Sequence, residues 1–269
     1  MHSPNGHSSR DIWLKHTQAR HALALVLPAL ARAGVQPVLV KGVALEATLY
    51  GDSAQRAISD VDLRVLPTQF KKVREVAMRA GWTIASFYPA YGSLCLDIEN
   101  MPVDIESHIG PPGLGRLRVK DLLDHGSMQT IGSTAVMVPD VTDHALLVIV
   151  NLFKDKITTA MPWAIGDLSR LVAHQDFDEQ LFLARAKRYR MALMSKVVLH
   201  QLGHDTPALR SLSNRVKAPA WFSLYLRAYN KHAKAPHALT ARLLARAGSD
   251  APLDWARALF LAARLEYGM

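Results

Sequence analysis

The chain has 269 residues, 49% hydrophobic and 20% charged, which is typical of a soluble globular protein with room for one large domain or two smaller ones. Its formal net charge is +9, and its single cysteine excludes an intramolecular disulfide framework and a thiolate metal cluster. No apolar run approaches the roughly 20 residues that span a bilayer. We therefore expect a protein of the reducing cytoplasm.

The first half of the chain mixes helical and strand patterns after a polar start, which we expect to be disordered over residues 1–10. Apolar residues at helical spacing predict helices over 11–34, 43–50 and 68–80. Short apolar or alternating runs predict strands over 38–40, 61–65, 82–87, 93–98, 102–108 and 136–138. The run rich in glycine and proline at 110–115 predicts a loop.

The second half shows no convincing strand. Its periodicity predicts helices over about 140–153, 163–174, 178–203, 218–233, 236–247 and 252–266. The expected fold class is therefore α+β, with a small mixed β-sheet core and flanking helices over residues 11–139, followed by an all-helical C-terminal domain over 140–269.

Positive charge concentrates in the helical half. Residues 182–246 contain 13 Lys or Arg and one acidic residue, Asp205. Such a bias attracts polyanions, such as nucleic acid, nucleotide phosphates or an acidic protein. A set of solvated helix faces accounts for the same charges equally well.

Two carboxylates two residues apart, Asp60 and Asp62, lie in a predicted strand. Alternate side chains of a strand share a face, so both carboxylates point the same way. They repel each other and favour a divalent cation between them. The apolar neighbours Ile58, Val61 and Leu63 anchor the strand. An Asp-x-Asp pair alone is more often a turn or a solvated edge than a catalytic site.

A second acidic strand strengthens this interpretation. Over residues 103–108, Asp104, Glu106 and His108 share one face, while the other face is apolar. Such a strand often faces solvent, but beside the Asp-x-Asp strand it supplies a third carboxylate. Three carboxylates can hold two Mg²⁺ or Mn²⁺ ions, one activating an attacking hydroxyl and one neutralising a triphosphate. Asp104 is also a candidate general base.

A third feature, Lys41-Gly42, stands between the first strand and a helix. Glycine lets the backbone approach a phosphate, the following helix N-terminus offers amide groups, and Lys41 carries a neutralising charge. Arg56, four residues before Asp60, is within reach of the same phosphates. A plain strand-to-helix turn and a surface arginine are the simpler explanations of these residues.

Together these segments resemble the uncharacterised nucleotidyltransferase family of the DNA polymerase β-like superfamily. The resemblance covers about residues 15–200 and rests on Val38–Ala44, Leu49–Gly51, Arg56–Val65 and Val103–Ile105, with a weaker match at Trp163–Leu171. It implies transfer of a nucleoside monophosphate from a nucleoside triphosphate to an acceptor, with release of pyrophosphate. The acceptor is a small molecule, a protein or an RNA, and a polyanionic acceptor suits the basic half.

The resemblance also implies roles for individual residues. Asp60, Asp62 and Asp104 match the metal-binding and catalytic carboxylates of the family. The expected nucleotide-binding residues are Lys41, Gly42, Arg56 and Ser59. Lys41-Gly42 replaces the Gly-Ser of better-known relatives. Where the family often has histidine two residues after the third aspartate, this chain has Glu106, so either Glu106 is a further metal ligand or the local chemistry differs.

Three other functions compete with this one. A glycosyltransferase also holds a nucleotide-sugar through Asp-x-Asp and a metal, but it normally places a larger nucleotide-binding unit before that pair than this chain has room for. A haloacid-dehalogenase-type phosphatase needs a different residue pattern after the pair. A non-catalytic nucleotide- or RNA-binding module is disfavoured because all three candidate carboxylates are present.

Overall fold

A computed structural model describes residues 9–51, 55–110, 114–154, 162–233, 248–251 and 253–256. The chain divides into two compact units. The α/β unit comprises Met1–Ile109 and Arg118–Asp140, and the helical unit comprises Gly110–Leu117 and Val141–Met269. The expected boundary between an α/β domain and a helical domain, at residues 139 and 140, stays a prediction.

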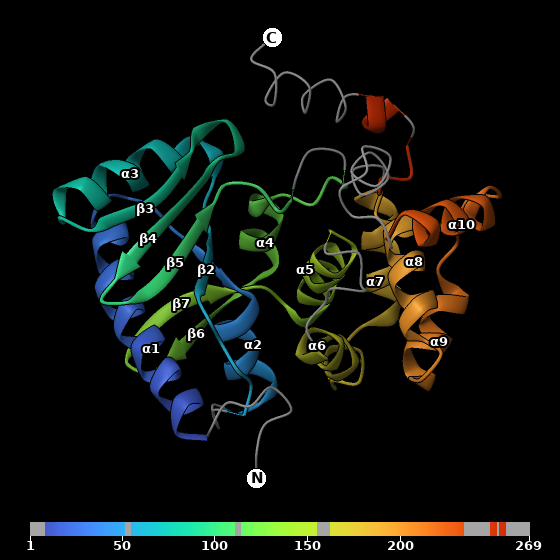
Figure 1. The fold of residues 1–269 in the computed structure, drawn as a ribbon, viewed down its shortest axis with the longest axis horizontal. Helices are drawn as coiled ribbons and strands as arrows, with labels where there is room; N and C mark the ends of the chain where they lie inside the picture. The colour runs from blue at the N-terminus through green and yellow to red at the C-terminus, as the bar shows by residue number, and fades with distance from the viewer. Residues whose placement is uncertain are drawn as a thin grey trace. The chain divides into compact units, whose positions relative to one another are not determined.

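Seven strands of the described residues form one mixed sheet in the α/β unit, in the order β3-β4-β5-β2-β1-β7-β6 (Figure 1). The two parallel pairs are β2 with β5 and β1 with β7, and the other neighbours are antiparallel. The strands are β1 (Val38–Val40), β2 (Val61–Arg64), β3 (Thr83–Tyr88), β4 (Ser93–Ile98), β5 (Met101–Glu106), β6 (Ser127–Ile131) and β7 (Thr134–Val138).

Helices cover both faces of this sheet (Figure 1). Helix α1 packs on β2, β5 and β7 and contacts α3, whereas α2 packs on β1 and β2, and α4 packs on β1 and β7. The helices are α1 (Ser9–Arg32), α2 (Lys41–Leu49), α3 (Phe70–Arg79) and α4 (Val119–His125). Short 3₁₀ turns stand at Pro67–Gln69 and Pro89–Tyr91.

Alternation along the central strands decides which face each side chain takes. Val61 and Leu63 of β2 join the hydrophobic core formed with α1 and α3. Since successive side chains point to opposite faces, Asp62 and Arg64 lie on the other face. Strand β5 repeats the pattern, with Ile105 in the core and Asp104 opposite it. The same physics that buries the apolar positions therefore gathers the carboxylates on one face.

The helical unit contains α5 (Val141–Lys154), α6 (Pro162–Val172), α7 (Glu179–Arg188), α8 (Ala192–Leu202), α9 (Pro207–Arg215) and α10 (Phe222–Ala233). Helix α5 contacts α6, α7 and α8, and its sequence is almost wholly buried. The expected α+β fold, a mixed sheet with flanking helices followed by a helical part, is confirmed. None of the described helices has the length and apolarity that a membrane-spanning helix needs.

Several element predictions need correction. Helix α1 begins at Ser9, inside the segment expected to be disordered, and residues 1–8 lie outside the described part. The helix expected over 178–203 is two helices, because Arg190 adopts a left-handed φ of 55° that ends α7. The structure adds α4, β6 and α9. The helix expected over 236–247 and most of that over 252–266 lie outside the described residues.

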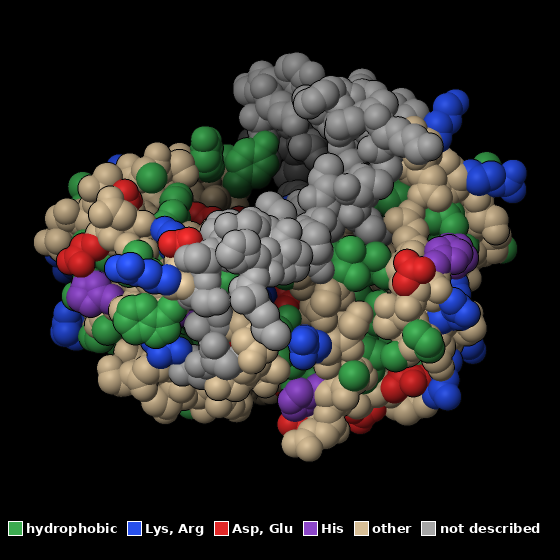
Figure 2. Space-filling view, turned by 60° about the horizontal axis from the view of Figure 1, so that its bottom comes forward, with side chains coloured by type: hydrophobic (Ala, Val, Ile, Leu, Met, Phe, Trp, Pro, Cys, Tyr) green, Lys and Arg blue, Asp and Glu red, His purple; other side chains and the backbone are tan. Residues whose placement is uncertain are grey.

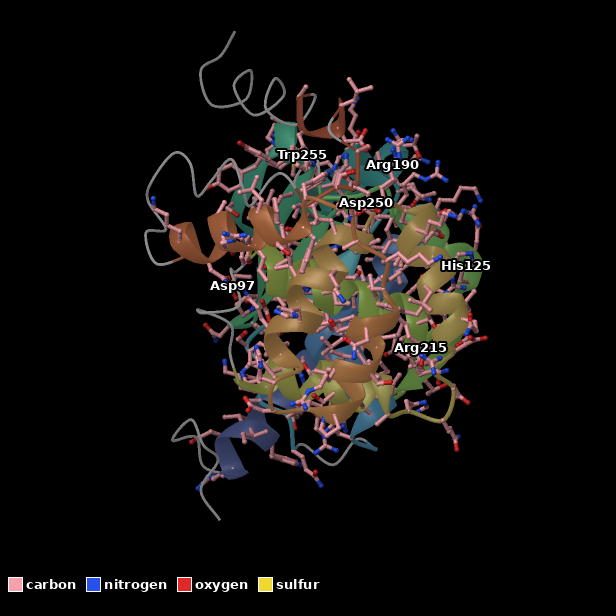
Figure 3. The ribbon with its side chains drawn as sticks, turned by 90° about the vertical axis from the view of Figure 1, so that its right-hand side faces the viewer. Asp97, His125, Arg190, Arg215, Asp250 and Trp255 are labelled. Atoms are coloured by element: carbon pink, nitrogen blue, oxygen red, sulfur yellow. The ribbon has the colours of Figure 1, made fainter. Side chains whose placement is uncertain are left out.

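The described C-terminal segment caps helix α8 within the helical unit. Asp250 accepts hydrogen bonds from the backbone N–H groups of Ala192, at 3.1 Å, and Leu193, at 2.6 Å. Trp255 Nε1 donates to the carbonyl of Ser249 at 2.7 Å, and Figure 3 shows Trp255 and Asp250 in the same region as Arg190. This segment thus supplies the N-terminal acceptor that α8 lacks in its own sequence.

We expect Asp143→Ala to destabilise the helical unit by about 3–5 kcal/mol, because the substitution leaves a buried guanidinium without its carboxylate. The side chain of Asp143 is 0% exposed, and Arg185 Nη1 lies 3.1 Å from its Oδ1. Urea denaturation of the full chain measures the loss. The double variant Asp143→Ala, Arg185→Met should lose less than the two single changes together. Strict additivity would contradict this coupling.

Candidate active site

Three carboxylates converge on the sheet face opposite the α1–α3 core. Asp62 of β2 and Asp104 of β5 are register partners on adjacent parallel strands, and Asp60 immediately precedes β2. One oxygen from each of these residues lies within 4.8 Å of the others. The pairing of β2 with β5 therefore brings together side chains that are 42 residues apart in the chain.

The chemistry of this donor set fits a hard divalent cation. Three carboxylates offer only oxygen ligands, which Mg²⁺ and Mn²⁺ prefer. A soft donor, the thiol of Cys95, lies beside the cluster, since Cys95 pairs with Asp104 across β4 and β5. Burial, followed by the hydrogen bond to Asp104, raises the pKa of this thiol to about 12, so it stays protonated and is a poor metal ligand. The oxygen ligands thus define the site.

The surroundings of Asp60 oppose its ionisation. Burial and the charge of Asp62 raise the pKa of Asp60 above its usual value, although Ser59 and Lys41 act in the opposite direction. The hydroxyl of Ser59 donates to Oδ1 of Asp60 at 2.9 Å. A carboxylate held in this way is stabilised in its ionised form by a bound cation. Ser59 touches the carboxylate cluster directly, and its expected nucleotide contact stays a prediction.

We expect Mg²⁺ to raise the melting temperature more at about pH 7.5 than at about pH 4. Because the folded-state pKa of Asp60 is raised, protonation of Asp60 stabilises the fold at low pH, and that stabilisation is lost as the pH rises through the folded pKa. A bound cation offsets this loss of stability only when the carboxylates are ionised. Thermal melts with and without Mg²⁺ at both pH values measure this. An equal shift at both would contradict it, and Asp60→Asn should abolish most of the shift at high pH.

Lys41 stands at the first position of α2 and contacts the cluster. Its Nζ donates to Oδ1 of Asp62 at 2.5 Å, and Asp62 is only 3% exposed. The backbone of Lys41 is left-handed, with φ of 55°, a conformation that costs a non-glycine residue roughly 1–2 kcal/mol and often marks a functional position. The residue before the helix, Val40, provides no side-chain cap, so the backbone N–H groups at the N-terminus of α2 can bind other partners.

Gly42 makes room for a buried arginine. A Cβ at Gly42 would lie 2.8 Å from Nη1 of Arg56 and 3.2 Å from Cγ2 of Ile58, so any larger residue would displace the guanidinium. Arg56 is 5% exposed and donates from Nη1 to the carbonyl of Ala57 at 3.1 Å. The structure thus places Arg56 against the start of α2, while the expected phosphate contacts of Gly42 and Arg56 stay predictions.

Two residues that sequence reasoning missed hold the segment before Asp60. The carboxylate of Glu46, 1% exposed on α2, accepts the backbone N–H of Gln55 with one oxygen and that of Arg56 with the other, each at 3.1 Å. His16 of α1, also buried, donates from Nε2 to the carbonyl of Arg56 at 2.8 Å. The sequence offered one signal of this role, since Glu46 is an acidic residue inside the apolar run of α2.

We expect Glu46→Gln to lower the rate of the reaction at this site by about tenfold to a hundredfold. Glutamine keeps one acceptor but points an amide N–H at the second backbone donor, so the segment leading to Asp60 shifts. The matched control is Asp121→Asn, another buried carboxylate of the α/β unit, which accepts the backbone N–H of Arg118 at 2.9 Å. Both variants should melt at lower temperature. Equal loss of rate in both would contradict a positioning role for Glu46.

Glu106 lies two residues beyond Asp104 on β5 and thus two register positions further along the same strands. Its Oε2 is 2.5 Å from Nη2 of Arg64, its register partner on β2, which is itself 3% exposed. The group whose oxygens lie within 4.8 Å contains Asp60, Asp62 and Asp104. The geometry therefore favours Asp104 as the third ligand and gives Glu106 a partner of opposite charge. A metal contact by Glu106 stays a prediction.

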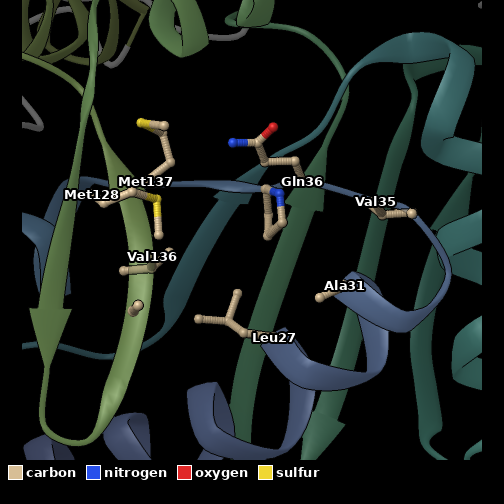
Figure 4. A pocket seen from close by; sticks show the side chains of 10 residues that line it. Leu27, Ala31, Val35, Gln36, Met128, Val136 and Met137 are labelled. Atoms are coloured by element: carbon tan, nitrogen blue, oxygen red, sulfur yellow. The ribbon is translucent and has the colours of Figure 1, made fainter.

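A cavity of about 380 Å³ in the α/β unit lies away from these carboxylates. Leu27 of α1, the segment 34–37 and Met137 of β7 are among its lining residues (Figure 4). This segment leads into the start of β1, whereas Lys41 follows the end of β1. The cavity and the carboxylate cluster thus occupy opposite ends of one strand.

Comparison with known proteins gives one family match and several similar solved structures. A family described as uncharacterised nucleotidyltransferase matches residues 7–204. Similar solved structures include the antibiotic-resistance factor ANT(2'')-Ia, at 12% identity and a TM-score of 0.45 over 70% of this chain and 98% of that chain. Another is an antigenic nucleotidyltransferase-like protein from Paracoccidioides brasiliensis, at 11% identity and a TM-score of 0.47 over 76% of this chain and 95% of that chain.

No curated protein sequence matches the chain. The family match alone spans well over half of the 269 residues and includes every strand of the sheet and all three carboxylates. The chain therefore belongs to the family of uncharacterised nucleotidyltransferases.

Proposed function

We propose that the protein transfers a nucleoside monophosphate from a nucleoside triphosphate to an acceptor in a reaction that requires Mg²⁺ or Mn²⁺. Family membership supports nucleotidyl transfer in general. The observation that carries the metal dependence is the convergence of Asp60, Asp62 and Asp104, with one oxygen from each within 4.8 Å of the others. These three residues are the proposed metal ligands and catalytic residues.

The proposed reaction is a displacement at the α-phosphorus. A hydroxyl, amine or phosphate of the acceptor bonds to that phosphorus, the bond to the bridging oxygen breaks, and pyrophosphate leaves. A bound metal supplies charge neutralisation and acidifies the attacking group. The carboxylate of Asp104 takes the acceptor's proton when this carboxylate is not fully engaged as a metal ligand. The protein's remaining contribution is to position the reactants.

The start of α2 is the proposed site for the triphosphate. Its amide groups point along the helix axis and its dipole favours an anion. Val40 leaves the N-terminus of this nine-residue helix without a side-chain cap. Lys41 supplies a charge, and Gly42 permits close approach of the backbone. Arg56 lies against Gly42, and Ser59 is hydrogen-bonded to Asp60 of the carboxylate cluster.

The acceptor belongs to one of three classes: a small molecule, a protein side chain or an RNA end. Several Lys and Arg residues of the basic segment 182–246 are engaged in contacts within the helical unit. These are Arg185 with Asp143, Arg190 with Asp254, Lys196 with the Ser213 carbonyl, Arg210 with the Gly203 carbonyl, and Arg215 with Glu179.

On the face that Figure 2 shows, Lys and Arg side chains of the described residues are scattered among acidic and uncharged ones. On this face, the distribution favours an acceptor recognised by a few contacts over one bound along a continuous basic patch.

Parallel reactions with α-labelled and γ-labelled nucleoside triphosphates test the proposal. The full chain is incubated with Mg²⁺ or Mn²⁺, with and without cell extract as a source of acceptor. We expect the α-label to enter an acceptor and the γ-label to appear in pyrophosphate. Release of inorganic phosphate from the γ-position as the sole product would contradict the proposal and indicate a hydrolase or kinase. A labelled nucleotide-sugar in the same assay tests glycosyl transfer.

A further inference from the structure

We propose that the ammonium of Lys41 is a counter-ion of Asp62, where it occupies the place of a metal ion. When metal and nucleotide bind, this ammonium leaves Asp62 and pairs with the triphosphate. This inference rests on the proposed function and assigns Lys41 two successive partners. Its starting point is the contact already described, in which Nζ of Lys41 lies 2.5 Å from Oδ1 of Asp62.

The charge balance of the cluster explains why such a cation is present. Three carboxylates lie together, and the side chain of Asp62 is 3% exposed, so water screens it poorly. A buried carboxylate without a partner is costly, and clustered like charges add to that cost. The ammonium of Lys41 lowers both costs before any metal arrives.

The ammonium and a metal ion compete for the negative charge of the same carboxylate, Asp62. A Mg²⁺ ligand oxygen lies about 2.0–2.1 Å from the ion, which is shorter than the contact Lys41 now makes. Two cations on one carboxylate oxygen would lie close enough to repel strongly in a poorly solvated site. Repulsion from a metal ion bound at Asp62 therefore favours departure of the ammonium.

The position of Lys41 gives the released side chain a second partner. It stands at the first residue of α2, where the triphosphate is proposed to bind, and its side chain is 29% exposed and thus able to turn without unfolding its neighbours. Its left-handed φ of 55° fixes the backbone at the junction between β1 and α2. Rotation about the side-chain bonds then moves the charge away from the carboxylate and toward the proposed triphosphate.

This arrangement couples the two ligands. A metal ion alone displaces the ammonium of Lys41 from Asp62 but brings no new anion for it. When the nucleotide binds as well, its triphosphate is that anion. Without nucleotide, the pairing of Lys41 with Asp62 therefore weakens metal binding. With metal bound, the released lysine strengthens nucleotide binding.

The first test replaces the cation by an uncharged side chain of similar length. We expect Lys41→Met to bind Mn²⁺ about tenfold more tightly than the wild type without nucleotide, as measured by electron paramagnetic resonance of free Mn²⁺. The same variant should bind a non-hydrolysable triphosphate analogue with Mn²⁺ at least tenfold more weakly. Lys72→Met, on the exposed side of α3, is the matched control and should change neither. Unchanged or weaker Mn²⁺ binding by Lys41→Met would overturn the proposal.

The second test follows the lysine itself by acetylation and mass spectrometry. We expect the reactivity of Lys41 to rise severalfold when Mn²⁺ alone is added, because the ammonium loses its carboxylate, and to fall again when the triphosphate analogue is added. Lys71 and Lys72 report the general reactivity and should stay constant. Constant labelling of Lys41 by a protein that binds Mn²⁺ and transfers the α-label would overturn this inference alone. Absence of both Mn²⁺ binding and label transfer would instead count against the proposed function.

Discussion

Asp62→Asn should lower the rate of nucleotidyl transfer by about a thousandfold, roughly 4 kcal/mol of transition-state stabilisation. Asparagine keeps the shape of the side chain and one oxygen but removes the charge that balances a divalent cation. Asp62 is buried at the centre of the cluster, paired with Asp104 across the strands, so water cannot replace the lost carboxylate. The measurement is kcat/KM for transfer of the α-label at saturating Mg²⁺.

The fold should survive this substitution, which separates chemistry from stability. Removal of one of three clustered negative charges relieves repulsion, although it also removes the partner of Lys41. We expect melting temperatures without metal within a few degrees of the wild type. The same loss of rate is expected for Asp60→Asn. Wild-type rates in either folded variant would show that the reaction uses a different site.

The second large effect separates the two candidates for the third ligand. We expect Asp104→Asn to lower kcat/KM by about a thousandfold, because it removes a carboxylate from the cluster, whereas Glu106→Gln should lower it by about tenfold or less. Glu106 contacts Arg64, and this pair lies two register positions away from Asp62 and Asp104. Its loss should mainly affect stability, since Arg64 is 3% exposed and would keep an uncompensated charge.

Metal titrations of both variants provide the control for this comparison. Asp104→Asn should need much higher Mn²⁺ concentrations for half-maximal rate, and Glu106→Gln should keep the wild-type requirement. The reverse ranking of the two variants would make Glu106 the third ligand and would contradict the assignment drawn from the geometry.

The central part of the fold follows directly from residue patterns. Strand β4 runs over the residues expected, and β2 ends one residue before the expected limit, because apolar positions alternate with polar ones along both strands. Asp62 can pair with Asp104 only if β2 and β5 are neighbours in the sheet. The family resemblance implies this neighbourhood, whereas the periodicity of the sequence alone does not reveal it.

Other elements carry weaker signals. Four of the five residues of β6 are exposed, and Ser127–Ile131 shows no apolar alternation to indicate a strand. The break between α7 and α8 depends on a left-handed Arg190, a conformation that arginine rarely adopts and sequence does not indicate. Tertiary packing decides such positions, so local propensity cannot.

The same limit applies around the site. The ligand candidates could be read from spacing, but their partners could not, since each contact joins segments far apart in the chain. Glu46 binds backbone groups at 55 and 56, and Arg64 pairs with Glu106 across parallel strands. Such contacts depend on three-dimensional proximity, which short motifs do not encode.

The most direct test of the site is crystallographic. Crystals of the full chain grown with Mn²⁺ and a non-hydrolysable nucleoside triphosphate, measured at the manganese absorption edge, locate the metal without reference to activity. We predict anomalous peaks within coordinating distance, about 2.0–2.3 Å, of oxygens of Asp60, Asp62 and Asp104, with the triphosphate at the start of α2. Manganese bound with the triphosphate elsewhere in the chain, and none at these carboxylates, would contradict the proposed active site.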